Sequence, residues 1–283
     1  MLLKNEIESI FEKNKHRLLS FCAPVENPTA FILGGQGASG KSLLAQRIGR
    51  MYDSPFLFIN GDDYRIFHPQ HEHLISNNTD DYSSLTQPFS NIFTENLINE
   101  AIKNKFNVII EGTMRNQNVP YKTANLLKEY GFIVNAAVIA AHPKLTELNC
   151  YSRFFNEVSL NAFGRLADIN SHNMAADNMP KSIDFLYQKK VVDSIHFFKP
   201  FPIEKLDVYN CKNGVWDKGV KPSIIIENER QKQIYDKGLI SERLKFWDKQ
   251  KNKVDGMVIY KKMGDSIASE ILLGDMSNKD TQI

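Results

Sequence analysis

One short run of glycines and polar residues constrains the fold of this chain more than any other feature. Residues 35–42 read GQGASGKS, which matches the pattern G-x-x-x-x-G-K-[ST]. The run follows the apolar segment AFILGG at 30–35, which is predicted to be a strand, and it opens KSLLAQRIGRMY at 41–52, which is predicted to be a helix. A strand, a glycine-rich loop and a helix in this order form a P-loop. The chain is therefore predicted to bind the phosphates of a nucleotide.

Each part of this loop has an expected role. Glycines let consecutive backbone N–H groups point inward at an anion, and the positive end of the following helix adds to the field. We expect Lys41 to reach the β- and γ-phosphates of ATP, and the Ser42 hydroxyl to be the ligand for Mg²⁺. The predicted phosphate-binding residues are Gly35, Gln36, Gly37, Ala38, Ser39, Gly40, Lys41 and Ser42.

Short apolar runs alternate with helical patterns along most of the chain. Further strands are predicted at 55–60, 107–112, 132–141, 205–210 and 222–227, and helices near 89–104, 119–130, 143–158 and 172–192. Strands with few polar residues, separated by helices, indicate an α/β fold with a parallel sheet covered on both faces, as in P-loop NTPases and kinases. A polar loop from Gly61 to Pro88 is expected to interrupt the alternation, and loops of that length tend to be functional.

The pattern changes near both ends of the chain. Residues 1–28 are predicted to hold an amphipathic helix at 3–19, and residues 29–227 to form the P-loop kinase domain. Residues 228–283 are polar and helical in pattern, and they are predicted to be a solvated C-terminal helical extension.

Composition excludes several classes of protein. Lys and Arg number 35 against 33 acids, a net charge of +2, so neither nucleic acid nor an anionic membrane is expected as a partner. Three cysteines without a C-x-x-C pair indicate neither a disulfide framework nor a zinc site. Charges interrupt the apolar residues at the N-terminus, and no apolar run approaches the ~20 residues of a membrane span. A soluble, cytoplasmic protein is expected.

The acidic residues help to choose among reactions, because GTPase switches, motors and small-molecule kinases share the same loop. The strand at 107–112 ends in Glu111 where a switch or motor would carry a magnesium-binding Asp, and this favours a kinase. Asp62 and Asp63 follow the strand at 55–60, where one of them could accept a proton from an acceptor hydroxyl or, alternatively, cap the next helix. Arg153 and Arg165 could contact a triphosphate or be ordinary surface arginines.

Three histidines, His68, His71 and His73, fall within six residues. No acid or cysteine completes a metal-binding set at a suitable spacing. They are therefore expected in a polar loop that faces substrate or solvent.

From about residue 30 to residue 190 the chain resembles the zeta toxin family, the kinase component of bacterial toxin–antitoxin pairs. The resemblance depends on an ordered set of motifs. These are the P-loop, I-N-G-D-D-Y-R at 59–65, His68-Pro69, Thr94-Glu95, E-G-T-M-R at 111–115, V-P at 119–120, and Arg153 and Arg165 near the family's arginine spacing.

The resemblance implies an ATP- and Mg²⁺-dependent kinase that phosphorylates a hydroxyl of a UDP-N-acetylamino sugar, typically UDP-N-acetylglucosamine. It also implies a small helical antitoxin that blocks the ATP site. Asp62 matches the family's catalytic base, and Lys41, Arg153 and Arg165 match the groups that act on the phosphates. The positions that match its substrate contacts are Glu95, Glu111, Thr113 and Arg115.

Two residues of the loop depart from the family pattern. Gly37 and Ala38 stand where the family often has Pro and Gly, and Ala38 would be strained if its position requires a positive φ. Two other functions stay open: a kinase for another small hydroxyl compound, such as a nucleoside or an antibiotic, and an ATP-binding interaction protein without catalysis.

Overall fold

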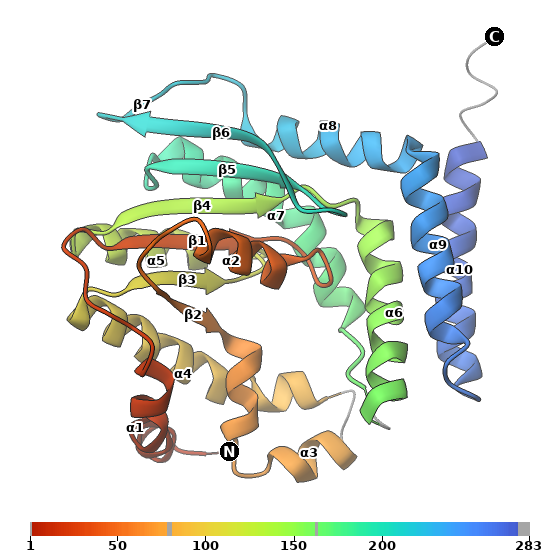
Figure 1. Cartoon of the computed structure of the whole chain (residues 1–283), viewed down its shortest axis with the longest axis horizontal. Coiled ribbons are helices and arrows are strands. Elements are labelled where there is room, and N and C mark those ends of the chain that lie inside the picture. The colour runs from red at the N-terminus through yellow and green to blue at the C-terminus, as the bar shows by residue number, and fades with distance from the viewer. Residues whose placement is uncertain (1, 78–80, 162–163, 277–283) are drawn as a thin grey trace.

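The computed structural model describes residues 2–77, 81–161 and 164–276 (Figure 1). Within them a central sheet has the strand order β2-β3-β1-β4-β5-β6-β7. The strands are β1 (Thr29–Gly34), β2 (Phe56–Asn60), β3 (Asn107–Glu111), β4 (Ile133–Ile139), β5 (Ser194–Lys199), β6 (Glu204–Lys212) and β7 (Val215–Trp216). The strands β1 to β5 are parallel, while β6 and β7 are antiparallel to their neighbours. The predicted α/β class is confirmed.

Helices cover both faces of this sheet. They are α1 (Lys4–Leu19), α2 (Lys41–Gly49), η1 (Gly61–Phe67, a 3₁₀ helix), α3 (His71–Asn77), α4 (Tyr82–Asn104), α5 (Asn118–Glu129), α6 (Pro143–Asn161), α7 (Ile169–Lys189), α8 (Pro222–Tyr235), α9 (Lys237–Lys251) and α10 (Val258–Met276). Among these described helices, none combines the length and apolar composition that a bilayer crossing requires.

Strand β1 shows how the two faces arise from the sequence. Its successive side chains point to opposite faces, since the side-chain period of a strand is two. Ala30 and Ile32 join the core under α1, α4, α5 and α7, whereas Phe31 and Leu33 join a smaller core under α2. A strand buried on both sides carries no alternation of polar and apolar residues, which is the pattern that predicted a parallel sheet.

The expected loop from Gly61 to Pro88 is wrong. That stretch contains η1, α3 and the first turns of α4, and Pro88 lies inside α4. A proline in a helix interior costs a hydrogen bond, so local sequence argued against a helix here. Tertiary packing overrides that cost, because Tyr82, Thr86 and Phe89 are all buried.

The strand predicted at 222–227 is also wrong, because α8 begins there with Pro222 in its first turn. Proline is favoured at that position, whereas the apolar run that follows resembles a strand. Only part of that run is buried: Ile226 is buried, and Ile224 is exposed. The structure adds the unpredicted strand β5, and α8 crosses the predicted boundary at residue 228.

The predicted C-terminal extension is helical, but the prediction that it is solvated is wrong. Helices α9 and α10 lie beside α6 (Figure 1) and share an apolar cluster with it. Trp247 of α9 is 1% exposed, and its ring centroid lies 5.5 Å from that of Phe155 in α6. A Cβ added to Gly264 of α10 would come within 2.4 Å of the Trp247 ring, so the glycine permits close packing. Polar residues cover the outer faces of these helices, which explains the misleading sequence pattern.

Candidate active site

Three segments that are distant in sequence meet at the carboxyl edge of the sheet. The P-loop follows β1, η1 follows β2, and the segment 111–115 follows β3. Strand β3 lies between β1 and β2 and is parallel to both, so the three connections start at the same edge (Figure 1). This is the edge where α/β sheets bind ligands.

The backbone of the P-loop is turned by three residues with positive φ. Gly35 has φ 151°, Ala38 has φ 55° and Gly40 has φ 100°. A Cβ on Gly40 would also lie 3.0 Å from Ile203 Cδ1, so a side chain is disfavoured twice at this position. Ala38 therefore occupies a position that requires a positive φ, and its backbone is strained. A non-glycine residue in this left-handed region costs about 1 kcal/mol of conformational free energy.

Several polar side chains of the loop are buried. Lys41 Nζ donates to the Gln36 carbonyl at 3.0 Å and lies 3.8 Å from Glu111 Oε1. Burial lowers the pKa of Lys41, and the charge of Glu111 opposes that shift. Among the described residues, Ser39 Oγ has no hydrogen-bond partner although it is buried. Buried hydroxyls are nearly always bonded, and a phosphate oxygen would supply an acceptor for Ser39, so the loop fits a phosphate ligand.

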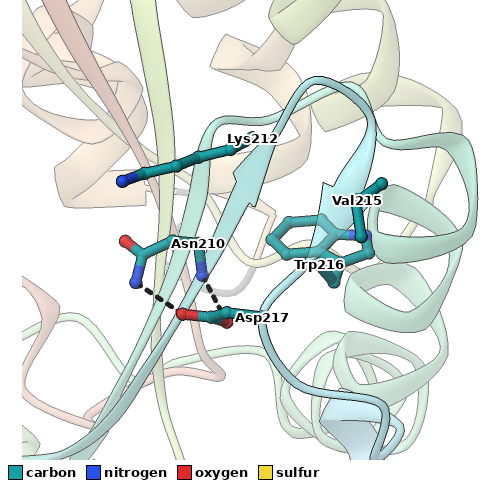
Figure 2. A pocket seen from close by; sticks show the side chains of 5 residues that line it. All are labelled: Asn210, Lys212, Val215, Trp216 and Asp217. Atoms are coloured by element: carbon teal, nitrogen blue, oxygen red, sulfur yellow. Dashed lines mark hydrogen bonds between the residues drawn. The ribbon is translucent and has the colours of Figure 1, made fainter.

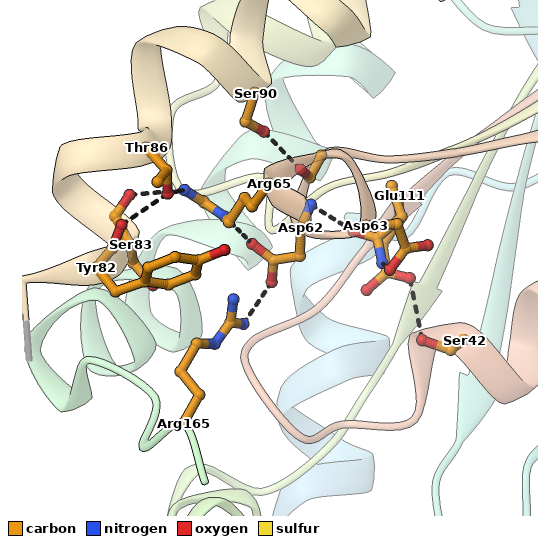
Figure 3. Close-up of polar contacts among 12 residues, drawn as sticks. Ser42, Asp62, Asp63, Arg65, Tyr82, Ser83, Thr86, Ser90, Glu111 and Arg165 are labelled. Atoms are coloured by element: carbon orange, nitrogen blue, oxygen red, sulfur yellow. Dashed lines mark hydrogen bonds and ion pairs between the residues drawn. The ribbon is translucent and has the colours of Figure 1, made fainter. Parts of the chain in front are cut away.

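Glu111 connects the loop to β3. Its Oε2 accepts a hydrogen bond from Ser42 Oγ at 3.2 Å (Figure 3). Burial raises the pKa of Glu111, and Lys41 opposes that shift. A hydroxyl and a carboxylate are oxygen ligands of the kind that Mg²⁺ prefers, together with phosphate oxygens and water. Ser42 and Glu111 therefore fit a magnesium ion beside a bound nucleotide.

Asp62 lies between two arginines (Figure 3). Its Oδ1 accepts from Arg65 Nε at 2.9 Å, and its Oδ2 accepts from Arg165 Nη2 at 2.6 Å. Burial alone would raise the pKa of Asp62, but the hydrogen bond and charge of Arg165 and the charge of Arg65 outweigh it and hold the pKa well below its usual range. The carboxylate is consequently ionised at neutral pH.

The neighbours of Asp62 and Asp63 show whether either residue caps η1, the next helix. Asn60 is the N-cap of η1, and its Oδ1 accepts from the Asp62 backbone N–H at 3.2 Å. Asp63 Oδ1 accepts from Asn60 Nδ2 at 3.1 Å, and burial followed by the charge of Asp62 raises the pKa of Asp63. Neither aspartate caps this helix, so the alternative prediction that Asp62 or Asp63 is a helix cap is wrong for η1.

Arg153 and Arg165 approach the site from α6 and from the segment before α7. Both have Glu157 as a neighbour: Arg153 Nε lies 3.6 Å from its Oε1, and the Arg165 backbone N–H donates to its Oε2 at 2.9 Å. Arg153 Nε is buried without a hydrogen-bond partner in the described part of the chain. The charge of Arg153 also helps to lower the pKa of Lys41, which places the guanidinium near the P-loop.

The predicted substrate contacts divide into two groups. Glu111 lies at the P-loop, and Arg115 Nη1 donates to Ser171 Oγ at 3.0 Å in the first turn of α7. Glu95 is exposed on α4 and Thr113 is half-buried after β3. Within the described ranges, neither Glu95 nor Thr113 forms a hydrogen bond to another site residue, and their roles stay predictions.

Sequence reasoning missed Arg65 as a site residue, although its motif was recognised. The available signal was its spacing, because residues three apart lie one above the other on a 3₁₀ helix, as Asp62 and Arg65 do. Recognising it required knowing that residues 61–67 form such a helix.

His68 and His71 have different hydrogen-bond partners. His68 Nδ1 accepts from the Gln70 backbone N–H at 3.1 Å, while His71 Nδ1 lies 2.7 Å from the Tyr82 hydroxyl. In the described portion of the chain, no group of three or more His, Cys, Asp or Glu side chains is placed to hold a metal ion.

A cavity of about 430 Å³ lies at the β6–β7 hairpin, at the opposite end of the strand order from β2 (Figure 2). Asp217 in its wall accepts from the backbone N–H and the Nδ2 of Asn210, at 2.9 and 2.8 Å. None of the residues predicted from the sequence to form the site lines this cavity, which is lined by Asn210, Lys212, Val215, Trp216 and Asp217.

Comparison with known proteins gives a consistent result. The family model for zeta toxin matches residues 15–239. The chain is 26% identical over 238 residues to a protein named Toxin zeta from Streptococcus agalactiae, covering 83% of this chain and 80% of that one. It is 31% identical over 150 residues to Toxin PezT from Streptococcus pneumoniae, covering 53% of this chain and 59% of that one.

Solved structures agree with the fold. A structure from the PezAT chromosomal toxin–antitoxin system of Streptococcus pneumoniae superimposes with a TM-score of 0.76 at 21% identity, covering 89% of this chain and 98% of that one. A chain from the AvrRxo1-ORF1:AvrRxo1-ORF2 structure with sulphate ions gives a TM-score of 0.53 at 13% identity, covering 95% of this chain and 88% of that one. At these identities the likeness concerns the fold alone.

Proposed function

Because the chain belongs to the zeta toxin family of P-loop kinase-like toxins, we propose that it transfers the γ-phosphate of ATP to a hydroxyl of a UDP-N-acetylamino sugar, such as UDP-N-acetylglucosamine. One observation carries the proposal. The P-loop, Glu111 and Asp62 lie at one sheet edge, with Lys41 and Arg165 beside them. This arrangement supports a phosphate donor site next to an acidic acceptor site.

On the donor side, residues 35–42 hold the triphosphate through backbone N–H groups. Ser42 and Glu111 would hold the magnesium ion, which would neutralise charge on the phosphates. Lys41 places a buried positive charge where negative charge develops on the transferred group, and Arg153 and Arg165 add to it. Because Lys41 is fixed by the Gln36 carbonyl, little reorganisation is needed as the reaction proceeds.

On the acceptor side, Asp62 orients the attacking hydroxyl and accepts its proton. A loose transition state needs little nucleophile activation, so an ionised carboxylate with a low pKa can still serve. When Arg165 turns to the triphosphate, Oδ2 of Asp62 becomes free for the hydroxyl and the pKa of Asp62 rises, since that arginine now lowers it. Glu95, Thr113 and Arg115 are the proposed contacts to the sugar nucleotide, while Glu111, which the resemblance also implies as a substrate contact, is assigned to the magnesium ion because it bonds Ser42.

The test is incubation of the purified chain with ATP, Mg²⁺ and a pool of UDP-sugars, nucleosides and antibiotics, with products identified by mass spectrometry. A phosphorylated UDP-N-acetylamino sugar is expected, and about a thousandfold less of it is expected from Lys41→Ala. Phosphorylation of a nucleoside or antibiotic instead would refute the substrate. ATP binding without any transfer would refute the kinase and favour an interaction protein.

We also propose a small helical antitoxin as a partner that covers the ATP site. The PezAT system supports this proposal, since its name describes a toxin–antitoxin pair. The product of a short neighbouring reading frame is expected to copurify with the chain and to compete with a fluorescent ATP analogue. Simultaneous binding of both would contradict a partner that covers the site.

A further inference from the structure

The Arg65 side chain is fixed at four points between η1 and α4. It is 5% exposed. Its Nη1 donates to the Ser83 carbonyl at 2.7 Å and to Thr86 Oγ1 at 2.6 Å, and its Nη2 donates to Gln87 Oε1 at 2.9 Å. Its Nε donates to Asp62 Oδ1 at 2.9 Å (Figure 3). Arginine presents its donors in a rigid fork, so three contacts to α4 determine where Nε points.

The acceptors around Arg65 are themselves held in place. Thr86 Oγ1 donates its own proton to the Tyr82 carbonyl at 2.6 Å, which leaves its lone pairs for the guanidinium. Ser90 Oγ donates to the Gly61 carbonyl at 2.6 Å and fastens the start of η1 to the same helix. Helix α4 therefore acts as the rigid support of the Asp62 turn.

The two oxygens of Asp62 differ in how firmly they are held. Oδ1 is bound to Arg65, whose side chain is 6% exposed, while Oδ2 is bound to Arg165, whose side chain is 25% exposed. We infer that Arg65 is a positioning residue that holds Oδ1 of Asp62 and thereby presents Oδ2 to the acceptor hydroxyl. This inference rests on the proposed kinase function.

Arg65 could be a structural ion-pair partner, which stabilises η1 without affecting the reaction, or a positioning residue, which acts through Asp62. The ionisation of Asp62 distinguishes these two roles. Removing the charge of Arg65 raises the pKa of Asp62, because that charge is one of the causes that lower it. The other charged or titratable groups that face Asp62 stay in place in such a variant. They are Asp63, Arg165, Tyr82, Lys41 and Glu111.

The experiment compares Arg65→Gln and Arg65→Lys with Arg17→Gln, which removes an exposed charge of α1 that lies over the Phe67 ring at the end of η1 and not at Asp62. For Arg65→Gln, kcat falls by about a hundredfold with an unchanged KM for ATP, as expected for a misplaced catalytic group. The acid limb of kcat/KM for the acceptor moves to higher pH, because the charge of Arg65 lowers the pKa of Asp62. Arg65→Lys keeps the charge but not the fork, so it restores the acid limb and leaves kcat low. Arg17→Gln matches the wild type.

A second variant covers the case in which Arg65→Gln does not fold. Gln87→Ala removes the side-chain oxygen that accepts from Arg65 Nη2. Gln87 is only partly buried, so the substitution leaves the fold intact. It lowers kcat severalfold without changing the KM for ATP, and an unchanged kcat would overturn the inference.

A direct measurement keeps this inference separable from the proposed function. The Asp62 carboxyl carbon is titrated by NMR in the wild type and in each variant. A kcat loss in Arg65→Gln with an unmoved acid limb and an unmoved Asp62 pKa would make Arg65 merely structural. If the wild type transfers no phosphate, the proposed function fails, and the titration alone decides whether Arg65 controls Asp62: an unmoved pKa overturns that control as well.

Discussion

The donor half and the acceptor half of the candidate site are built in different ways. The donor half, residues 35–42, is shaped by its own backbone, with positive φ at Gly35, Ala38 and Gly40. The acceptor half is shaped by side chains from distant segments. Arg65 reaches Thr86, 21 residues away, and Arg165 reaches Asp62 across 103 residues.

Because of this difference, the donor half indicates only the class of ligand, whereas the acceptor half bears on the reaction. A cradle of backbone N–H groups can bind any triphosphate, so it identifies the ligand class and not the reaction. A carboxylate held between two arginines can act only on a group that fits beside it. We therefore expect changes in the donor half to affect ATP binding and turnover together, and changes in the acceptor half to affect turnover alone.

Lys41→Ala has the largest expected effect. Removing a preorganised charge at the transferred phosphoryl group lowers kcat by about a thousandfold and weakens ATP binding. Steady-state kinetics and calorimetric titration with ATP measure the two effects, with Lys4→Ala on α1 as a control, since the Lys4 side chain is 74% exposed. Unchanged activity in Lys41→Ala would remove the P-loop from the mechanism.

Asp62→Asn is the matching test of the acceptor half. Loss of the base lowers kcat by about a hundredfold while ATP affinity stays near that of the wild type. The same two assays apply. A comparable loss of ATP binding would assign Asp62 to the magnesium site or to the structure, and the contrast between the two halves would disappear.

Asp62 also links the acceptor half to acid stability. Its pKa is lower in the folded chain than in the unfolded chain, so its contribution to the free energy of unfolding is complete above the ordinary aspartate value and is lost as pH falls through the folded value. Asp62→Asn lowers that free energy by about 1 kcal/mol at neutral pH, a modest figure because the Asp62 side chain is 45% exposed. Urea unfolding measures it. The difference in the free energy of unfolding between the wild type and Asp62→Asn becomes smaller as pH falls from about 5 to about 2. A difference that does not change with pH would show that the stabilisation does not come from the charge of Asp62.

Ala38→Gly has the smallest expected effect and tests the backbone of the donor half. Glycine relieves the strain at φ 55° but adds freedom to the unfolded chain, so the free energy of unfolding rises by about 0.5 kcal/mol. Ala45→Gly in the interior of α2 is the matched control. It is expected to lower the free energy of unfolding by about 1 kcal/mol. Thermal unfolding of both variants gives the comparison, and equal destabilisation would show that the loop is not strained at Ala38.

Errors in the sequence reading cluster where packing outweighs local pattern. Pro88 suggested the end of a loop, yet α4 continues through it because Phe89 and its neighbours are buried. The polar pattern beyond residue 228 suggested a solvated tail, yet Trp247 is buried against α6. In both cases the deciding contacts join residues far apart in the chain, which local patterns cannot register.

The sequence by itself determined the P-loop, the parallel sheet and the family, because these depend on residues that act on their own backbone or repeat with a regular period. It also supplied Asp62, Glu111 and Arg165 as candidates, and their roles stay predictions. Only the tertiary structure decided that Arg65 and Arg165 bind opposite oxygens of Asp62 and that Glu111 reaches Ser42. The physical reason is that hydrogen bonds act over about 3 Å, and only the folded sheet brings the ends of β1, β2 and β3 to one edge.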